Sequence, residues 1–364
     1  MDKLKKMYIP KKYDKKVVDK GEFVFAAVGL DHGHIYGMCD GLIQAGAELS
    51  FVYDPDQEKI KKFTEKYPNV RVCTSLTEVL ENPNVHMIAS ASIPSERITI
   101  GLKTLDNNKH FFSAKPGFIE DKQLNKARSK VKETNLKWGI YYNERLHVES
   151  AIFAGELIEA GAIGEVVQVI GTGPHRANID TRPDWFFEPE QYGGILCDIG
   201  SHQIEQFLHY TKANDAKVLH SKVGNYAFSN YPGLQDFGDA TLLADNGTTF
   251  YFRVDWLTPD GLGTWGDGRT LILGTEGYIE LRKYIDVARS SATDNLYLVN
   301  NMGESHFELS NKVGFPFFGE FILDCLNGTE NAMSQQHAFK TAELSIEAQE
   351  KSMHIQHSMN SKNT

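Results

Sequence analysis

Short apolar runs alternate with amphipathic stretches between residues 22 and 142. The runs EFVFAAVG, ELSFVY, VRVC, VHMIASA and HFFSA have the length of strands, and stretches such as DQEKIKKFTEKY and ERITIGLKTLDNN have helical spacing. This alternation predicts parallel strands joined by crossover helices. The strands are almost continuously apolar, which is typical of a sheet covered by helices on both faces. We therefore expect a doubly wound parallel sheet in this part of the chain.

The pattern changes beyond about residue 143. Helical stretches near residues 148–160 and 199–210 are followed by strand-like segments with no helix between them, including TTFYFRVDWL, RTLILG and GYIELRKY. Short turns such as ADNGTT predict a largely antiparallel sheet. The expected fold class is α/β. It comprises a Lys-rich arm (1–21), a dinucleotide-binding Rossmann domain (22–143), a second α/β domain (144–353) and a tail (354–364).

Composition supports a two-domain globular protein. At 364 residues the chain is longer than one hydrophobic core usually fills. Its net charge of −10 repels phosphate backbones, so we expect no nucleic-acid partner. No stretch approaches the roughly 18 to 20 apolar residues of a membrane span, and the Lys-rich start has no apolar signal-peptide core. We therefore expect a cytoplasmic protein without a membrane partner, whose Lys-rich arm is a solvated tail.

The first strand ends in a turn that contains glycines. Gly29 and Gly33 flank Asp31 and His32, and His34 follows, where a dinucleotide-binding fold places a glycine-rich turn and a helix N-terminus. Backbone amides at such a point suit a pyrophosphate. The match to GxGxxG is imperfect, because Asp31 stands at the second glycine and His34 at the third. A tight turn that binds nothing is the alternative interpretation.

Asp31, His32 and His34 also have the chemistry of metal ligands. Ligands this close in sequence seldom converge without a distant partner, and the positive end of a helix opposes a cation. We therefore expect a hydrogen-bonding or substrate-facing role for these residues, and no metal. The four cysteines are widely spaced without a CxxC pair, which indicates reduced thiols and no structural zinc.

The second strand ends at Asp54. This is about the distance from the turn at which an acidic residue accepts hydrogen bonds from the adenosine ribose, and a carboxylate there favours NAD over NADP. Asp54 also precedes Pro55, so a helix cap is the alternative. Taken together with the glycine turn, the ribose role is the stronger hypothesis.

Three further residues have the chemistry of a catalytic site. Lys115 follows the strand HFFSA, and Pro116 favours an extended backbone for it, so its ammonium is expected at the carboxyl edge of the sheet. Asp198 and His202 are four residues apart in a helical pattern, so both side chains reach one helix face. Histidine transfers protons near neutrality, and a carboxylate supports its charged form. A surface lysine and an ordinary polar pair are the alternatives.

The ordered set of motifs resembles the Gfo/Idh/MocA oxidoreductase family. The set comprises the strand, turn and helix ending at Asp54, then Ile93-Pro94-Ser95, Ala114-Lys115-Pro116, Asn143-Glu-Arg145 and Gly193-Gly194 with Asp198-x-x-x-His202. The resemblance covers nearly the whole chain from about Glu22. It implies a Rossmann domain, a C-terminal α/β domain built on a large open sheet, nicotinamide cofactor use, and homodimers or homotetramers formed through that sheet.

The resemblance also implies residue roles. Lys115 corresponds to the lysine of the family's Glu-Lys-Pro signature, and Asp198 and His202 correspond to its catalytic aspartate and histidine. This chain departs from the family pattern at Ala114, where glutamate is common, and at Asp31 and His34, where glycines are common. The expected cofactor contacts are Gly29, Asp31, His32, Gly33, His34, Asp54, Pro94 and Lys115. The expected substrate contacts are Arg145, His175, Arg176, Trp185, Tyr192, Asp198 and His202.

These features predict an NAD-dependent oxidoreductase, with NADP the less favoured cofactor, that acts on a hydroxyl group of a sugar, sugar derivative or cyclitol. One alternative is an NAD-dependent glycosidase acting by transient oxidation and elimination. Another is a catalytically silent sugar or dinucleotide sensor, because a fold alone does not confer activity. The departures from the family pattern in the glycine turn and at Ala114 are the reason to keep the sensor as an alternative hypothesis.

Overall fold

The computed structural model describes residues 3–13 and 15–355. Contacts divide the chain into two compact units. The parallel-sheet unit comprises Pro10–Ile152 and Asn311–Glu343, and the mixed-sheet unit comprises Met1–Ile9, Phe153–Ser310 and Leu344–Thr364. Most of the expected tail, residues 356–364, lies outside the described residues. That residues 22–143 and 144–353 form two separate domains stays a prediction.

The parallel-sheet unit contains six strands in the order β3-β2-β1-β4-β5-β6. All five strand pairs are parallel, and the chain winds outward from β1 in both directions, which is the topology of a Rossmann fold. The strands are β1 (Val24–Val28), β2 (Glu48–Tyr53), β3 (Arg71–Val72), β4 (Met87–Ser90), β5 (His110–Ala114) and β6 (Trp138–Tyr141). The prediction of a doubly wound sheet is confirmed.

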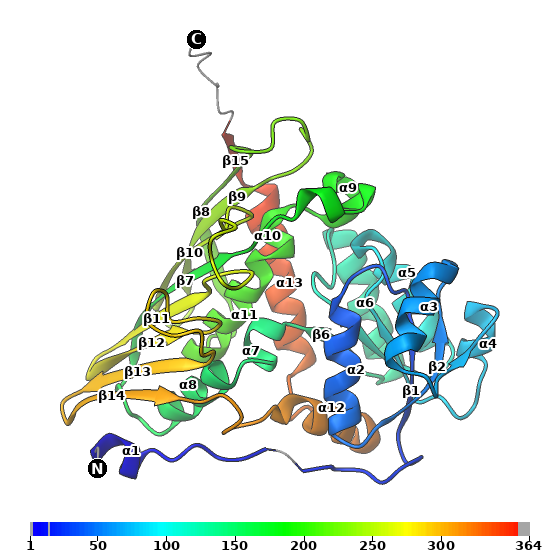
Figure 1. The fold of residues 1–364 in the computed structure, drawn as a ribbon, viewed down its shortest axis with the longest axis horizontal. Coiled ribbons are helices and arrows are strands. Elements are labelled where there is room, and N and C mark those ends of the chain that lie inside the picture. Colours follow the sequence, from blue (N-terminus) through cyan, green and yellow to red (C-terminus); the bar gives the residue numbers. More distant parts are fainter. Residues whose placement is uncertain (1–2, 14, 356–364) are drawn as a thin grey trace. The chain divides into compact units, whose positions relative to one another are not determined.

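Helices connect these strands, as Figure 1 shows. Every residue of β1 and β4 is buried, which explains why these strands are apolar without alternation. The helices of this part are α2 (His34–Gln44), α3 (Gln57–Lys66), α4 (Leu76–Leu80), η1 (Pro94–Glu96), α5 (Arg97–Asp106), α6 (Asp121–Thr134) and α7 (Asn143–Leu146).

Helix α12 (Pro316–Asn327) belongs to the same unit although it begins 170 residues after the end of α7. The ring of Phe321 lies 5.3 Å from that of Phe112 in β5, and a Cβ at Gly139 in β6 would come within 2.6 Å of Phe321. Aromatic packing of this kind buries large apolar areas. Residues 311–343 therefore complete the core of the parallel sheet.

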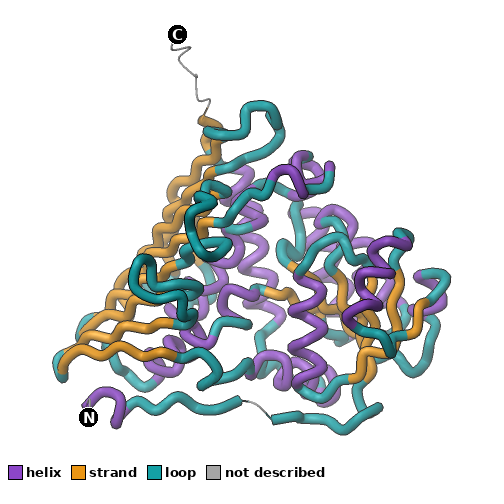
Figure 2. The backbone as a smooth tube through the Cα atoms, viewed as in Figure 1, coloured by secondary structure: helices purple, strands orange, loops and turns teal. Residues whose placement is uncertain are grey.

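The mixed-sheet unit contains a nine-stranded sheet in the order β14-β13-β12-β11-β7-β10-β9-β8-β15. Figure 2 shows these strands side by side. Six of the eight pairs are antiparallel, and β7–β10 and β8–β15 are parallel, so the expectation of a mainly antiparallel sheet is confirmed. The strands are β7 (Val166–Pro174), β8 (Ala216–Gly224), β9 (Phe237–Ala244), β10 (Thr249–Asp255), β11 (Arg269–Gly274), β12 (Gly277–Arg282), β13 (Asn295–Asn300), β14 (Gly303–Glu308) and β15 (Met353–Ile355).

One face of this sheet packs against helices. Helix α11 (Gly200–Thr211) contacts β7, β9 and β10, and its residues are buried except His209. The remaining helices are α1 (Lys3–Met7), α8 (Glu149–Glu159), η2 (Ile179–Thr181), η3 (Asp184–Phe187), α9 (Pro189–Tyr192), α10 (Ile195–Asp198) and α13 (Gln335–Glu350), the last of which ends in this unit. No helix of residues 3–13 and 15–355 is long and apolar enough to cross a membrane.

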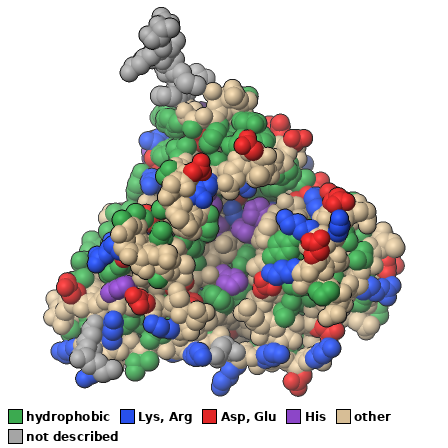
Figure 3. Space-filling model, viewed as in Figure 1, with side chains coloured by type: hydrophobic (Ala, Val, Ile, Leu, Met, Phe, Trp, Pro, Cys, Tyr) green, Lys and Arg blue, Asp and Glu red, His purple; other side chains and the backbone are tan. Residues whose placement is uncertain are grey.

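The Lys-rich arm is not the solvated tail that the sequence predicts. Leu4 is buried where α1 lies beside β14. Further along, the backbone amide of Tyr13 donates to the carbonyl of Val313 at 2.6 Å, and that of Val17 donates to Ala45 at 2.9 Å. Figure 3 shows Lys and Arg side chains along the stretch where Figure 1 draws this arm. The lysines of the described part of the arm are exposed, whereas Leu4 and Val18 are buried between them, a pattern that the high lysine content obscures.

Candidate functional site

The turn after β1 requires a glycine at its first position. Gly29 has φ +71°, and a Cβ there would lie 2.6 Å from the Cβ of Ser92. The amide of Gly29 donates to Tyr53, and its carbonyl accepts the amide of Ala91, so the turn joins the ends of β2 and β4. A Cβ on Gly33 would meet nothing within 4 Å. The turn is therefore closed beneath Gly29 and open beside Gly33.

His32 and His34 lie at the N-terminus of α2. The amide of His34 donates to Nδ1 of His32 at 3.1 Å, and the two rings pack edge to face with centroids 4.1 Å apart. The first turn of α2 contains no acidic residue. Within the described ranges, no group of three His, Cys, Asp or Glu residues has an arrangement suited to a metal. The open space at Gly33, beside the positive end of α2, has the room that a phosphate group needs.

Asp54 is buried at the end of β2. Its Oδ2 accepts the amide of Leu30 at 2.7 Å, and its Oδ1 accepts the amide of Asp56 at 2.8 Å. Burial raises the pKa of the Asp54 carboxyl against the lowering effect of these two bonds. The ribose contact stays a prediction, and the structure adds that this carboxylate holds the glycine turn. The cap of α3 is Asp56, which accepts the amides of Glu58 and Lys59, and not Asp54.

Asp31 forms an ion pair with Lys59 of α3. The Nζ atom of Lys59 lies 2.6 Å from Oδ1 of Asp31 and 3.9 Å from the carboxylate of Asp56. Burial lowers the pKa of Lys59, but the neighbouring carboxylates outweigh burial and leave it raised. Burial, together with the charge of Asp31, raises the pKa of Glu96. One lysine thus faces a group of carboxylates at the turn. No sequence motif includes Lys59, and a lysine on an amphipathic helix is typical of a solvated face.

Lys115 follows β5 at the carboxyl edge of the parallel sheet, as predicted. It is 3% exposed, and the Lys115–Pro116 peptide bond is cis. Pro94 is buried at the first position of η1, after β4. Arg145 is buried in α7 and lies close enough to Glu320 to oppose the rise that burial causes in the pKa of that carboxyl. Lys115 and Pro94 therefore share the edge at which the glycine turn lies.

Asp198 and His202 are both buried in the mixed-sheet unit. Asp198 ends α10 and His202 lies in the first turn of α11. Ile199, between the two helices, keeps right-handed helical dihedral angles, so the four-residue spacing still follows a helical path. The amide of His202 donates to Ile199, and the hydroxyl of Ser201 donates to the carbonyl of Asp198. The two residues thus belong to two short helices rather than to one, but the backbone between them keeps the helical path that the sequence predicts.

Two of the predicted substrate residues, Tyr192 and Arg176, make hydrogen bonds that hold the surrounding loops. Tyr192 is buried, and its hydroxyl donates to the carbonyl of Gly233 and accepts from the amide of Gln235, which ties the end of α9 to the loop before β9. Arg176 donates to the carbonyls of Pro259 and Leu262, so its guanidinium holds the loop that follows β10. These contacts show structural work for both residues, and substrate contact stays a prediction.

His175 and Trp185 lie in aromatic groups. The ring of His175 is 4.5 Å from that of Trp265 and 5.3 Å from that of Trp256. Trp185 packs against Phe186. The Nε1 of Trp256 is buried and has no hydrogen-bond partner among the described residues. A buried donor of this kind gains from a ligand oxygen, so Trp256 joins the candidate substrate residues.

Arg182 is a second charged residue that lies outside the sequence motifs and that we did not predict as a site residue. Its guanidinium lies 4.3 Å from the ring centroid of Phe186 and 4.8 Å from that of Trp256, and its Nε donates to Ala177. Burial lowers the pKa of Arg182, and the charge of Asp198 partly offsets this. Arg182 therefore supplies a positive charge in the surroundings of Asp198. Three aromatic residues within five positions of Arg182 were the available sequence signal.

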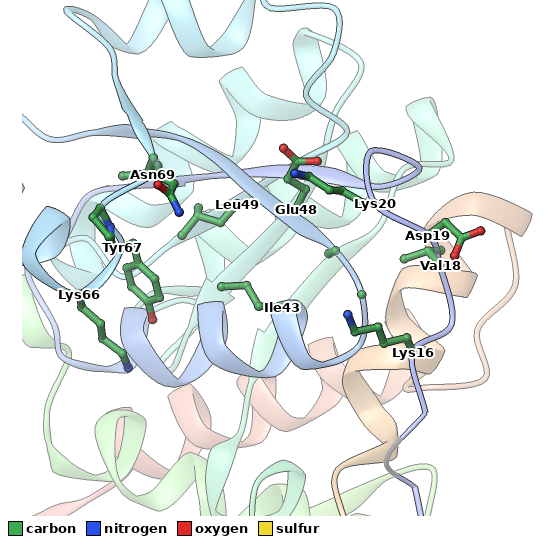
Figure 4. A pocket seen from close by; sticks show the side chains of 14 residues that line it. Lys16, Val18, Asp19, Lys20, Ile43, Glu48, Leu49, Lys66, Tyr67 and Asn69 are labelled. Carbon is green, nitrogen blue, oxygen red and sulfur yellow. The ribbon is translucent and has the colours of Figure 1, made fainter.

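A separate cavity of about 440 Å³ lies beside the C-terminal part of α2 (Figure 4). It is lined by residues of the arm, α2, β2 and the segment after α3, among them Lys16, Ile43, Glu48 and Tyr67. None of the predicted site residues lines it. The candidate residues therefore lie elsewhere in each unit: at the strand ends of the parallel-sheet unit and in the α10–α11 region of the mixed-sheet unit.

Comparisons with known proteins concern the fold and the relatives of this chain. A family model described as the GFO/IDH/MocA C-terminal domain matches residues 153–280. A solved structure from Erwinia carotovora atroseptica SCRI1043, assigned as an oxidoreductase, has 50% identity and a TM-score of 0.90, covering 92% of this chain and 100% of that one. Levoglucosan dehydrogenase, solved with NADH and levoglucosan, has 15% identity and a TM-score of 0.76, covering 90% of this chain and 97% of that one.

Curated relatives match over shorter stretches. D-xylose dehydrogenase from Paenarthrobacter nicotinovorans is 23% identical over 171 residues, which are 45% of this chain and 44% of that protein. The chain spans less than half of the length of three of the four curated relatives that it matches.

Proposed function

This chain belongs to the Gfo/Idh/MocA family of oxidoreductases, and we propose that it transfers hydride between a hydroxyl-bearing carbon of a sugar, sugar derivative or cyclitol and a nicotinamide dinucleotide. The observation that carries the proposal is the burial of Lys115, Asp198 and His202, which are 3%, 9% and 2% exposed. Burying an ammonium, a carboxylate and an imidazole is costly, and such groups concentrate at functional sites. Their residue types suit acid–base work on a hydroxyl group.

The chain's own residues supply three tasks. His202 accepts the proton of the reacting hydroxyl, because a neutral imidazole is a suitable base near neutral pH. Lys115 donates a hydrogen bond to the same oxygen and stabilises the charge that develops on it. Asp198 orients the imidazole or a neighbouring hydroxyl. A bound nicotinamide accepts or returns the hydride, and that redox chemistry belongs to the cofactor.

NAD is the proposed cofactor, with NADP less favoured. The open space at Gly33, beside the positive end of α2, suits a diphosphate. Asp31, Asp54, Asp56 and Glu96 provide negative charge near the turn, and Lys59 neutralises part of it. A ribose 2′-hydroxyl is compatible with carboxylates, whereas a 2′-phosphate is repelled by them.

The substrate class rests on the relatives. D-xylose dehydrogenase and levoglucosan dehydrogenase both act on carbohydrates by name. Trp256, His175 and Arg182 add aromatic and charged groups near Asp198 that suit a polyhydroxylated molecule. We propose a cytoplasmic enzyme whose partner is a small sugar or polyol.

We also propose a homodimer or homotetramer formed through the nine-stranded sheet. Its solvent face carries exposed apolar side chains on neighbouring strands, including Tyr251, Leu271 and Leu273. Ile170 of β7 pairs with both Tyr251 and Leu271, so the three positions form a row across the sheet. Contiguous apolar rows of this kind mark interaction surfaces.

Calorimetric titration of the purified protein with NAD and NADP, after a check for retained nucleotide, tests the cofactor. A sugar and polyol oxidation screen then tests the reaction. Aryl glycoside cleavage without net NADH would favour the NAD-dependent glycosidase. NAD binding without either activity would favour a sensor, and no binding with no retained nucleotide would contradict the dehydrogenase.

A further inference from the structure

Arg97 connects two loops at the carboxyl edge of the parallel sheet. It is the first residue of α5 and is fully buried. Its Nε donates to the carbonyl of Ser92 at 2.8 Å, and its Nη1 donates to the carbonyls of Ala114 at 3.2 Å and Pro116 at 2.7 Å. One guanidinium therefore binds the segment that follows β4 and the segment that follows β5.

The carbonyls that Arg97 binds are those on either side of Lys115. Ala114 precedes Lys115 and Pro116 follows it, so the lysine backbone is held from both directions by the same nitrogen. The methyl group of Ala114 supplies no polar contact to the neighbouring lysine, whereas the guanidinium acts through the backbone. A planar guanidinium presents several donors in a rigid geometry, which a flexible ammonium lacks.

A second buried cation in the same unit allows a comparison. Lys109 immediately precedes β5 and is 4% exposed. Its Nζ donates to the carbonyls of Asn82 at 2.7 Å and Val85 at 2.9 Å, and burial lowers its pKa. Lys109 and Arg97 thus perform similar structural work at opposite ends of β5. Only Arg97 adjoins a candidate catalytic residue.

We propose that Arg97 is a positioning residue that fixes the backbone of Lys115, and through it the direction of the lysine ammonium. The catalytic consequence rests on the proposed dehydrogenase function. Misplacing a catalytic group by about 1 Å costs on the order of 100-fold in rate. The loss of Arg97 is therefore expected to lower kcat more than it changes KM.

The test compares R97M, which removes the donors, with the matched control K109M. In the full-length protein, brief acetylation followed by peptide mass spectrometry measures the reactivity of the Lys115 amine. We expect reactivity to change at least about fivefold in R97M, through local opening of the loop, and to stay within about twofold in K109M. R97K retains the charge with a less suitable geometry, so an intermediate reactivity is expected.

Kinetics give an independent readout. R97M should lower kcat by about 10- to 100-fold with KM for the sugar within about threefold, whereas K109M should lower stability with kcat nearly unchanged. Equal changes in Lys115 reactivity in the two variants, or none in R97M, would overturn the proposal. If R97M does not fold, R97K carries the same comparison. If the wild type oxidises no sugar, the dehydrogenase function fails while acetylation still decides the positioning role.

Discussion

The carboxylate of Asp54 accepts the backbone amide of Leu30 at 2.7 Å, which ties the end of β2 to the turn after β1. Since its other oxygen accepts the amide of Asp56, both oxygens serve the backbone. The residue best placed in sequence to bind a ribose is thus also a support for the turn that would bind the diphosphate.

Replacing Asp54 with asparagine should weaken both functions. One carboxylate oxygen becomes an amide NH₂ that cannot accept a backbone N–H, so the free energy of unfolding should fall by about 1–3 kcal/mol. Urea denaturation measures the stability, and NAD titration measures the affinity, which should fall too. D56N is the control, because asparagine also caps helices well. An unchanged stability in D54N would contradict the backbone role.

Lys59→Met should weaken NAD binding by leaving Asp31 negative beside the turn. The lysine side chain is 36% exposed, so solvent screens the pair, and we expect a loss of only about 3- to 10-fold at low salt, smaller at high salt. The double variant D31N/K59M should recover most of the affinity. K61M removes an exposed lysine from the same helix and serves as the control. Equal NAD affinities for K59M and K61M would contradict a role of the Asp31–Lys59 ion pair in NAD binding.

Lys115→Met and His202→Asn should each lower turnover by about two to four orders of magnitude, because they remove charge stabilisation and proton transfer respectively. NAD affinity should survive in H202N far better than turnover does. Steady-state kinetics with the best substrate of the screen, together with NAD titration, check both statements. Wild-type turnover in both variants would refute the assignment.

His110 should make the protein less stable in mild acid. The amide of Lys137 donates to its Nδ1 at 3.0 Å, and burial, with smaller effects from Lys137 and His86, lowers the pKa of His110 to about 4. An unfolded histidine has a pKa of about 6.5, so the unfolded state takes up a proton first as the pH falls. The stabilisation is therefore complete above pH about 6.5 and is lost toward pH about 4.

Urea denaturation of the wild type and H110Q across this pH range isolates the effect, because glutamine offers an acceptor but does not titrate. The difference in unfolding free energy between the two proteins should shift against the wild type as the pH falls. A difference that does not depend on pH would show that His110 does not cause the loss.

The sheet surface is tested by charge insertion. Leu271→Lys places an ammonium in the apolar row and should convert the oligomer to monomer, because an unpaired charge buried at an interface is costly. Sedimentation velocity measures the change. L326K, at a similarly exposed leucine of α12, should leave the assembly intact. A wild-type monomer, or an oligomer that survives L271K, would point away from this face.

Local patterns predicted the order of the elements because strand and helix periodicity is a local property. Gly29 was predictable for the same reason, since the turn directly follows a buried strand. Packing across the chain was not predictable. The attachment of α12 depends on Phe321 meeting Phe112 and Gly139, and apolar residues carry no label for the partner that they pack against.

The roles of the charged residues Arg97, Lys59 and Arg182 could not be predicted from sequence motifs. Arg97 shares the buried face of α5 with Gly101, Thr104 and Leu105, and its i, i+4 spacing to Gly101 was a usable signal. Without coordinates, a charged residue at the start of a helix is interpreted as solvated. Lys59 and Arg182 were missed on the same grounds. Each acquires its role from a carboxylate or a carbonyl that lies far away in sequence.

The contribution of residues 311–343 to the parallel sheet bears on synthesis. The ribosome finishes strands β1 to β6 long before Phe321 and Gln335 emerge, and Gln335 accepts the amide of Trp138 in β6. A nascent chain that ends before residue 311 thus presents an uncovered aromatic surface on β5 and β6. The first sheet to be translated must wait for one of the last segments, and exposed apolar surface of that kind is what chaperones bind during translation.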